Sequence, residues 1–501
     1  MARVNARKLV RLSTVVGLSL AAGLWIAFAQ IRLFPSILNK CAIAHPWLLY
    51  NGFVDYQHIP GQKSPLMPMF LSWLLPVFNG DAALSARTTH AAVICFVVLI
   101  TMLWVYRHSG RWALLATGVF LLTWSNFFGL WAIMYYDVAL APLFLVVFVL
   151  SATQLEKPAT WKMAATGLVT GVAILTKQHA VLLPLPIAIM LVWQLRKRQV
   201  TARQLVGLGL TYLLGLALPV VIYVVYHYLR AGSLQDLIYW TITVNFGPYG
   251  SEAALAPDSE HVRDMLPALL MLIPFAGSIV FPTADMKPSR EVRLLMLAMF
   301  FLGAVLLYPR YSTRHWPTAF PFLAAMSGIA CADLIKAWRK HKASSMALIA
   351  ASIILCWTVI AALVYAPRLQ EIKPLRSDEY SGFFEVADQL RGRIPAEGGV
   401  VLLPLYEGNA NLSYALGRLP PHYWLFNFRW WMNPTTIGRW LEVMEQEKPY
   451  TLLFFPDTMD LDTYAPEIME YVNKNYKLVD TLKWGNSRQI EIMFRSPTGS
   501  P

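Results

Sequence analysis

The chain has 501 residues, of which 56% are hydrophobic and only 14% are charged, whereas soluble proteins carry roughly 25% charged residues. This composition excludes an ordinary soluble enzyme and predicts a polytopic α-helical membrane protein. The net charge of +13 is also found in nucleic-acid-binding proteins, but here the basic residues form clusters between apolar stretches. Such clusters are typical of membrane topology signals, so we expect no nucleic-acid partner.

The first apolar stretch, residues 12–31, follows four basic residues and is long enough to cross a bilayer core of about 30 Å. A cleaved signal peptide is the alternative, because Ala27-Phe28-Ala29 resembles a cleavage site. The stretch is longer than a usual signal core, which favours a retained helix. In both cases the next loop is expected on the outer side of the membrane.

Ten more apolar stretches raise the predicted number of transmembrane helices to about eleven. They lie at roughly 89–106, 112–130, 138–152, 163–176, 180–195, 205–228, 265–281, 294–307, 318–335 and 346–365. Residues 66–78 are also apolar, but this stretch is short and rich in proline, so we expect a helix lying at the membrane interface.

The charges of the loops agree with this count. Clusters of Lys and Arg fall on alternate loops, on the same side as the N-terminus, as the positive-inside rule requires. They are Arg107 with Arg111, Lys157 with Lys162, Arg196 to Arg203, Lys287 to Arg293, and Lys336 to Lys342. The opposite, outer side then receives the first loop (33–88), the segments around Asp137, Lys177 and Arg310, and the chain beyond Pro367.

From about residue 368 the composition becomes that of a soluble domain. The pattern predicts buried strands at 399–403 and 450–455, helices near 383–391 and 436–447, and a hairpin formed by 476–484 and 489–495. We therefore predict two domains, a transmembrane domain over 1–367 and an extracytoplasmic α/β domain over 368–501.

Two carboxylates lie on the predicted outer face. Asp55 is the only acidic side chain before Asp81, and Asp137 follows two tyrosines at the start of an apolar span. The plainer interpretations are a solvated loop acid for Asp55 and a helix-capping residue for Asp137. Two carboxylates in a partly desolvated cleft are also suited to acid–base chemistry, which is the interpretation we favour.

Several cations on the same face break the positive-inside pattern. Lys177 lies in a very tight turn, and Arg310 and Arg314 lie in a later outer segment. A snorkelling side chain would explain Lys177, but the two guanidinium groups favour an anionic ligand such as a phosphate. Lys63 and Arg87, which flank the proposed interfacial helix, are positioned to join the same site. A lipid-linked phosphate would fit such an outer-face cleft.

Histidines and cysteines show no ligand-type spacing. His45, His58 and His261 are scattered and are interpreted as ordinary loop histidines. Three of the four cysteines lie in apolar runs, so no structural disulfide is predicted. No cofactor is predicted, and no cluster requires a divalent metal.

Several short motifs together resemble the polyprenyl-phosphate-sugar-dependent membrane glycosyltransferases of the GT-C superfold. This group includes the protein O-mannosyltransferases and the aminoarabinose transferase of lipid A. The motifs are Gly52 to Tyr56 with Lys63-Ser64-Pro65-Leu66, Asp81 with Leu84-Ser85-Ala86-Arg87, Tyr136-Asp137, Gly167 to Gln178, and Arg310 to Pro321.

The resemblance implies an inverting transfer of a sugar from a polyprenyl-phosphate carrier to a lipid, glycan or protein acceptor at the outer face of the membrane. It implies that Asp55 is the general base and that Asp137 orients the acceptor. Relatives often carry acids at positions occupied here by Pro35 to Leu38 and by His58, so Asp137 remains an alternative base. The implied ligands of the donor phosphate are Lys63, Arg87, Lys177, Arg310 and Arg314. The implied substrate-binding residues are Tyr56, Tyr136, Gln178, His179 and His315.

A second class of function stays open, namely a lipid-linked glycan polymerase or ligase, or a flippase or transporter. A transporter is expected to carry ionisable residues deep within its spans and broken helices in both halves. Here the charges lie at the outer edge, which favours the enzyme.

Overall fold

The computed structural model describes residues 2–33, 41–128, 131, 134–247, 269–270, 272–280, 287–305, 313–339, 379–484 and 488–496. Within it the chain forms two compact units. The first unit contains 1–37, 87–223 and 255–373, and the second contains 38–86, 224–254 and 374–501. The boundary predicted at residue 367 and the span predicted at 346–365 lie outside the described residues.

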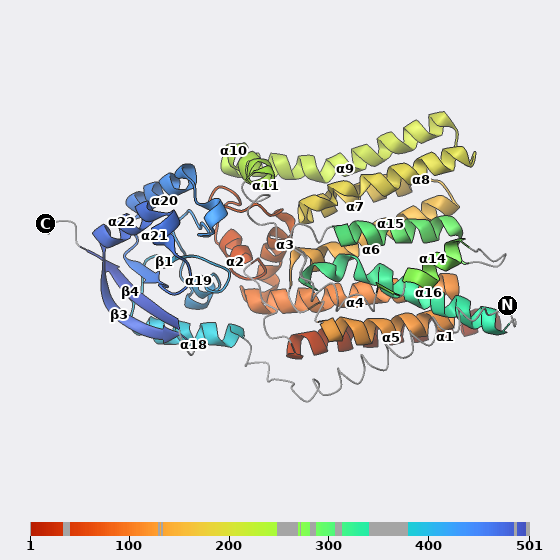
Figure 1. Cartoon of the computed structure of the whole chain (residues 1–501), viewed down its shortest axis with the longest axis horizontal. Coiled ribbons are helices and arrows are strands. Elements are labelled where there is room, and N and C mark those ends of the chain that lie inside the picture. The colour runs from red at the N-terminus through yellow and green to blue at the C-terminus, as the bar shows by residue number, and fades with distance from the viewer. Residues whose placement is uncertain are drawn as a thin grey trace. The chain divides into compact units, whose positions relative to one another are not determined.

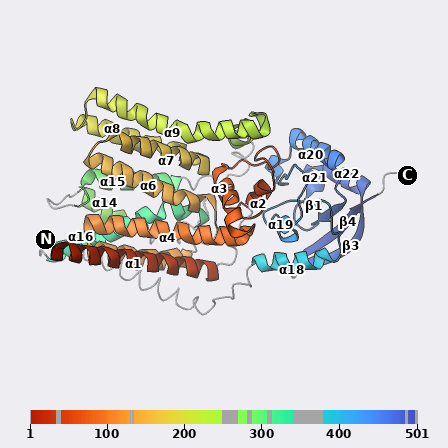
Figure 2. The same ribbon diagram turned by 180° about the vertical axis from the view of Figure 1, so that it is seen from behind.

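The first unit is a bundle of apolar helices (Figures 1 and 2). Its helices are α1 (Ala2–Leu33), α5 (Arg111–Phe128), α6 (Tyr136–Glu156), α7 (Thr160–Thr176), α8 (Pro184–Arg196), α14 (Leu272–Val280), α15 (Arg290–Val305) and α16 (Phe320–Arg339), with 3₁₀ turns at Gln178–Leu182 and Thr313–Thr318. Helix α4 (Ala82–Ser109) and helix α9 (Ala202–Ala231) have residues in both units.

Five helical segments of the described chain have the length and apolar composition needed to cross a membrane. They are Val10–Gln30, Ala82–Ser109, Tyr136–Glu156, Gln178–Arg196 and Ala202–Ala231. The predicted membrane fold is in keeping with these helices, while the number of about eleven crossings stays a prediction. The predicted interfacial stretch is helical, as α3 (Leu66–Leu74) and a 3₁₀ turn at Leu75–Phe78.

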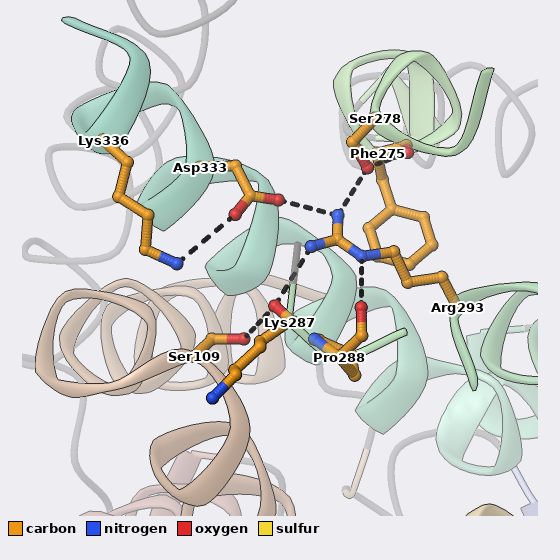
Figure 3. A network of polar contacts seen from close by, with 8 residues as sticks. All are labelled: Ser109, Phe275, Ser278, Lys287, Pro288, Arg293, Asp333 and Lys336. Carbon is orange, nitrogen blue, oxygen red and sulfur yellow. Dashed lines mark hydrogen bonds and ion pairs between the residues drawn. The ribbon is translucent and has the colours of Figure 1, made fainter. Parts of the chain in front are cut away.

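A buried arginine ties three helices of the first unit together (Figure 3). Arg293, at the start of α15, has no exposed surface and lies 2.7 Å from Asp333 of α16. It also donates hydrogen bonds to Ser278 of α14 and to the backbone oxygens of Lys287 and Pro288. The prediction that Arg293 is a loop cation is therefore wrong, because α15 begins at Arg290 and the guanidinium is satisfied inside the protein.

The second unit holds the C-terminal sheet. Its strands are β1 (Val400–Leu403), β2 (Thr451–Phe454), β3 (Tyr476–Trp484) and β4 (Arg488–Arg495), in the order β1-β2-β4-β3. Strands β1 and β2 are parallel, and the other two pairs are antiparallel. All four residues of β1 are buried, which requires cover on both faces of the sheet. The four predicted strands and the β3–β4 pairing are confirmed, whereas the turn at 485–487 lies outside the described residues.

Helices of the second unit come from all three of its chain segments. They are α2 (Ala44–Tyr50), α3, α10 (Gln235–Ile238), α11 (Val244–Phe246), α18 (Glu379–Arg391), α19 (Leu412–Leu416), α20 (Pro434–Glu447), α21 (Leu461–Tyr464) and α22 (Pro466–Asn475), with a π-helical turn at Tyr239–Thr243 and a 3₁₀ turn at Arg429–Trp431. Both helices predicted in the C-terminal region, near 383–391 and 436–447, are therefore confirmed as α18 and α20. Asn433 and Thr436 form a capping box that fixes the start of α20.

The N-terminal segment of the second unit is bonded to its C-terminal part. The backbone N–H of Trp424 donates to the His58 carbonyl at 2.8 Å, and the backbone N–H of Ala44 donates to the Asn411 side chain at 3.3 Å. Tyr414 bonds Asp81 at the start of α4. The loop that carries Asp55 is thus held by residues more than 300 positions away in the sequence.

Close packing of α7 on α9 depends on glycine. A β-carbon at Gly167 would lie 2.1 Å from the Tyr212 carbonyl oxygen, and one at Gly171 would lie 2.3 Å from the Leu216 carbonyl oxygen. Both distances are far below van der Waals contact, so the two backbones approach as in other small-xxx-small helix pairs.

We predict that Gly167→Ala separates α7 from α9 and lowers the free energy of unfolding by about 1–3 kcal/mol, the usual cost of overpacking. The measurement is the thermal unfolding midpoint in detergent. Gly209→Ala in α9 is the matched control, because a β-carbon there meets nothing within 4 Å. Equal midpoints for the two variants would contradict the close-packing account.

Candidate functional site

Asp137 lies in the first turn of α6, where the amide groups of the helix start favour a negative charge. The N-cap residue is Tyr135, whose backbone is extended, so the interpretation of Asp137 as the cap itself is wrong. The Asp137 side chain has no exposed surface, and a carboxylate buried in this way requires partners of opposite charge.

Both carboxylate oxygens of Asp137 are engaged. Lys177 Nζ lies 2.6 Å from Oδ1, and His315 Nδ1 lies 2.7 Å from Oδ2. Lys177 and His315 are themselves largely buried. The hydroxyl of Thr318 donates to the Asp137 backbone carbonyl at 3.3 Å. Asp137 lies at the start of α6, Lys177 directly precedes one 3₁₀ turn, and His315 lies in the other. The structure thus brings three chain segments together around one carboxylate.

Three residues predicted at the site, Tyr136, Lys177 and His315, gather around Asp137. The Tyr135 ring makes edge contacts with the rings of Tyr136 and His315, at 5.4 and 5.6 Å between centroids. Lys177 ends α7 in an extended conformation, and Gln178 and His179 open the 3₁₀ turn that follows. The tight turn predicted at this point of the chain is confirmed.

Asp55 lies in a second group of polar residues, within the second unit. Its carboxylate is only 8% exposed, and Oδ1 lies 3.0 Å from His45 Nε2. Oδ2 is buried and has no hydrogen-bond partner among the described residues. The interpretation of Asp55 as a solvated loop acid is therefore wrong. A buried, unpartnered carboxylate oxygen is costly and is suited to accept a proton from a bound group.

His45 was expected to be an ordinary loop histidine, but it lies in α2 and pairs with Asp55. Burial lowers the pKa of His45, but the charge and the hydrogen bond of Asp55, with a smaller contribution from Cys41, raise it to about 9. His45 is therefore protonated at neutral pH and donates to Asp55. The pair is not evident from the sequence. His45 and Asp55 are joined by an irregular loop and do not have a spacing typical of metal ligands.

His58 stands in a different environment. Its Nδ1 accepts a hydrogen bond from the Val54 backbone at 3.1 Å, and its ring lies edge-on to His422 at 5.1 Å. Burial and the neighbouring His422 and Arg439 lower the pKa of His58 to about 4. His58 is therefore neutral and acts as a hydrogen-bond acceptor that fixes the turn.

The other predicted residues are placed as follows. Tyr56 is buried, and its hydroxyl donates to the Lys63 carbonyl at 2.9 Å. Lys63, in the loop before α3, and Arg87, in α4, are half-buried. Arg310 and the side chain of Arg314 lie outside the described residues, as does His261. Among the described residues, no group of three or more His, Cys, Asp or Glu side chains is arranged to hold a metal ion.

Comparison with known proteins gives one family match and several similar structures. Residues 62–223 match the family described as dolichyl-phosphate-mannose-protein mannosyltransferase. No curated protein matches the chain by sequence.

The fold is similar to that of ArnT from Cupriavidus metallidurans. The structure bound to undecaprenyl phosphate has a TM-score of 0.61 at 15% identity, covering 97% of this chain and 99% of that one. The apo structure has a TM-score of 0.57 at 14% identity, covering 96% and 98%. The archaeal oligosaccharyltransferase AglB from Archaeoglobus fulgidus, in complex with an inhibitory peptide and a dolichol-phosphate, has a TM-score of 0.51 at 11% identity, covering 96% of this chain and 75% of that one.

The family match confirms the resemblance drawn from the sequence, and with it the predicted enzyme class, a glycosyltransferase. The similar structures show the same fold.

The His45–Asp55 pair predicts a pH dependence of stability. Because the pKa of folded His45 is raised from 6.5 to about 9, the pair contributes its full stabilisation below pH 6.5 and loses it as the pH rises through about 9. We expect the thermal midpoint of the wild type to fall more steeply between pH 6.5 and 9 than that of His45→Gln. Parallel pH profiles for the two proteins would contradict the pairing.

Proposed function

We propose that the protein transfers a sugar, with inversion, from a polyprenyl-phosphate carrier to an acceptor at the extracytoplasmic face of the membrane. The family match over 62–223 and the fold shared with ArnT, solved with undecaprenyl phosphate, support this class of donor. The acceptor belongs to the lipids, glycans or proteins of the cell envelope, and the membrane lipid surrounds the carrier.

One observation carries the proposal, the state of the Asp55 carboxylate. It is nearly buried, one oxygen is held by His45, and the other has no partner among the described residues. A general base needs this combination, because a fixed orientation and a free lone pair let it take a proton from a bound hydroxyl. Of the two candidate bases that the sequence left open, this geometry favours Asp55.

In the proposed reaction, Oδ2 of Asp55 accepts the proton of the acceptor hydroxyl. The acceptor oxygen forms a bond to the anomeric carbon, and the bond from that carbon to the phosphate oxygen breaks. The electron pair leaves with the polyprenyl phosphate. His45, as a cation, holds Asp55 in place and donates to Oδ1 throughout.

Asp137 takes a different role, because its oxygens are occupied by Lys177 and His315. We assign it to organising these two side chains in an orientation that can serve the departing phosphate. Negative charge grows on the phosphate as the bond breaks, and preorganised cations stabilise it. Lys63, Arg87, Arg310 and Arg314 are proposed to join Lys177 as phosphate ligands, and Tyr136, Gln178 and His179 to line the same site.

The orientation rests on the clusters of basic residues in the loops. They place the N-terminus inside, so the Asp55 loop and the C-terminal domain lie outside. The bonds between the Asp55 loop and the C-terminal residues support a role for the α/β domain in selecting the acceptor.

A second candidate, a lipid-linked glycan polymerase or ligase, is favoured by the similarity to the oligosaccharyltransferase AglB. The same fold there serves a different transfer. The donor separates the two, since a ligase of this kind takes an oligosaccharide from its lipid rather than a single sugar.

We predict that Asp55→Asn lowers turnover by about 10²- to 10⁴-fold, the usual contribution of a general base, while the protein stays folded. Turnover is measured as transfer of label from a panel of undecaprenyl-phosphate-linked ¹⁴C sugars into membranes of the source cells. Binding of labelled undecaprenyl phosphate is expected to remain near that of the wild type.

Asp137→Asn is the contrasting variant. It leaves Lys177 and His315 buried without their shared anion, so we expect a loss of about 3–5 kcal/mol in unfolding free energy and weaker binding of undecaprenyl phosphate. Wild-type turnover by Asp55→Asn, together with intact folding but no turnover in Asp137→Asn, would transfer the role of base to Asp137.

A further inference from the structure

The turn that carries Asp55 has a strained backbone. Tyr56 has a φ of +63°, in the left-handed region that residues with a β-carbon rarely adopt. Its N–H donates to the Ile59 carbonyl at 3.1 Å, and the N–H of Gln57 donates to the Asp55 carbonyl at 2.8 Å. Such a conformation persists only where its surroundings hold it, so the position of the Asp55 carboxylate depends on contacts made to this turn.

Two residues from the C-terminal part of the chain hold the turn at successive carbonyls. The backbone N–H of Trp424 donates to the His58 carbonyl at 2.8 Å. The guanidinium of Arg439, on α20, donates through Nη2 to the Gln57 carbonyl at 3.1 Å. Gln57 is only two residues from Asp55, so Arg439 acts on the same turn that orients the carboxylate.

The guanidinium of Arg439 is itself fixed. Its Nη1 lies 2.8 Å from Asp236 Oδ1, in the segment after α9, and its Cζ lies 4.9 Å from the centre of the Tyr423 ring. Asp236 thus fixes the guanidinium through one of its nitrogens, and the Tyr423 ring lies against the flat face of the group. The planar fork of arginine meets the Asp236 carboxylate and the Gln57 carbonyl at once through two nitrogens, whereas the donors of a lysine all lie on one nitrogen at the end of a flexible stem.

The ion pair alone would be a modest contribution to stability. Arg439 and Asp236 are 32% and 27% exposed, and pairs with this degree of exposure are screened by water. The bond to Gln57 connects this ion pair to the strained turn.

We infer that Arg439 is a positioning residue, which aligns the Asp55 carboxylate for proton transfer by holding the Gln57 carbonyl. The inference rests on the proposed function, because it takes Asp55 as the base. The C-terminal domain then contributes to the rate of the chemical step, in addition to any contact with the acceptor. Arg439 itself makes no bond to substrate in this account.

The test compares Arg439→Gln with Arg393→Gln in the full-length protein. Arg393 is the matched control, because it pairs with Asp480 at 2.9 Å in the same unit, with comparable exposure, and does not bond the Asp55 turn among the described residues. We expect Arg439→Gln to lower kcat by about 10- to 100-fold, as for a small misplacement of a catalytic group, with the KM for the labelled undecaprenyl-phosphate sugar nearly unchanged. Arg393→Gln is expected to keep both constants.

A coupling measurement separates positioning from general stability. Asp55→Glu keeps a carboxylate but already displaces it, so adding Arg439→Gln to Asp55→Glu should cost little further turnover. If Arg439→Gln proves unstable, Arg439→Lys carries the test. It keeps a charge beside Asp236 but does not hold Asp236 and the Gln57 carbonyl at once, so kcat is expected to fall while the thermal midpoint stays near that of the wild type; a wild-type kcat overturns the inference.

The outcomes that overturn the inference are distinct from those that overturn the proposed function. Wild-type kcat in Arg439→Gln, or a full additive loss in the double variant, overturns the inference while leaving Asp55 as the base. Wild-type turnover in Asp55→Asn overturns the base assignment, and the positioning role falls with it.

Discussion

The cost of burying a carboxylate governs how both groups of polar residues are built. An ionised side chain removed from water must find opposite charge or hydrogen-bond donors, or it destabilises the fold. Asp137 meets this requirement fully, with a lysine and a histidine on its two oxygens. Asp55 meets only half of this requirement. His45 bonds one of its oxygens, and the other has no partner among the described residues. The difference between the two carboxylates is therefore a difference in how completely burial is compensated.

Asp137 and Asp55 are therefore suited to two different chemical tasks. A carboxylate with a donor on each oxygen is less available as a base, but it can hold its partner side chains at defined positions, which suits the stabilisation of a leaving phosphate. A partly compensated one keeps an acceptor site that only a bound group can fill. Burial is also compensated elsewhere in the first unit, where the Arg293 guanidinium bonds Asp333, Ser278 and backbone carbonyls.

Much of the local structure follows from the sequence, because it depends on neighbouring residues. Local patterns of apolar residues located the four strands and two C-terminal helices, and the tight turn at Lys177 was evident from two closely spaced apolar runs. The sequence predicted that Tyr136, Lys177 and His315 lie on one face. It did not predict their arrangement around Asp137. The pairings themselves join residues 40 and 178 positions apart, and such contacts depend on how helices pack.

The contacts that sequence analysis missed also depend on how distant parts of the chain pack together. His45 was interpreted as an ordinary histidine because its partner Asp55 lies across an irregular turn rather than at a helical or metal-type spacing. Arg439 lies 382 residues from Gln57, and nothing in a single sequence links them. Arg293 was counted as a loop charge because an apolar run appears to begin one residue later, whereas the helix starts three residues earlier and buries it.

Mass spectrometry of the lipids that co-purify with the detergent-solubilised protein tests the central claim most directly. The account predicts a polyprenyl monophosphate or its ester with a single sugar, and the mass of the ester would identify the donor. Recovery of polyprenyl diphosphates carrying oligosaccharides, with no monophosphate species, would contradict the account and indicate a polymerase, ligase or flippase instead.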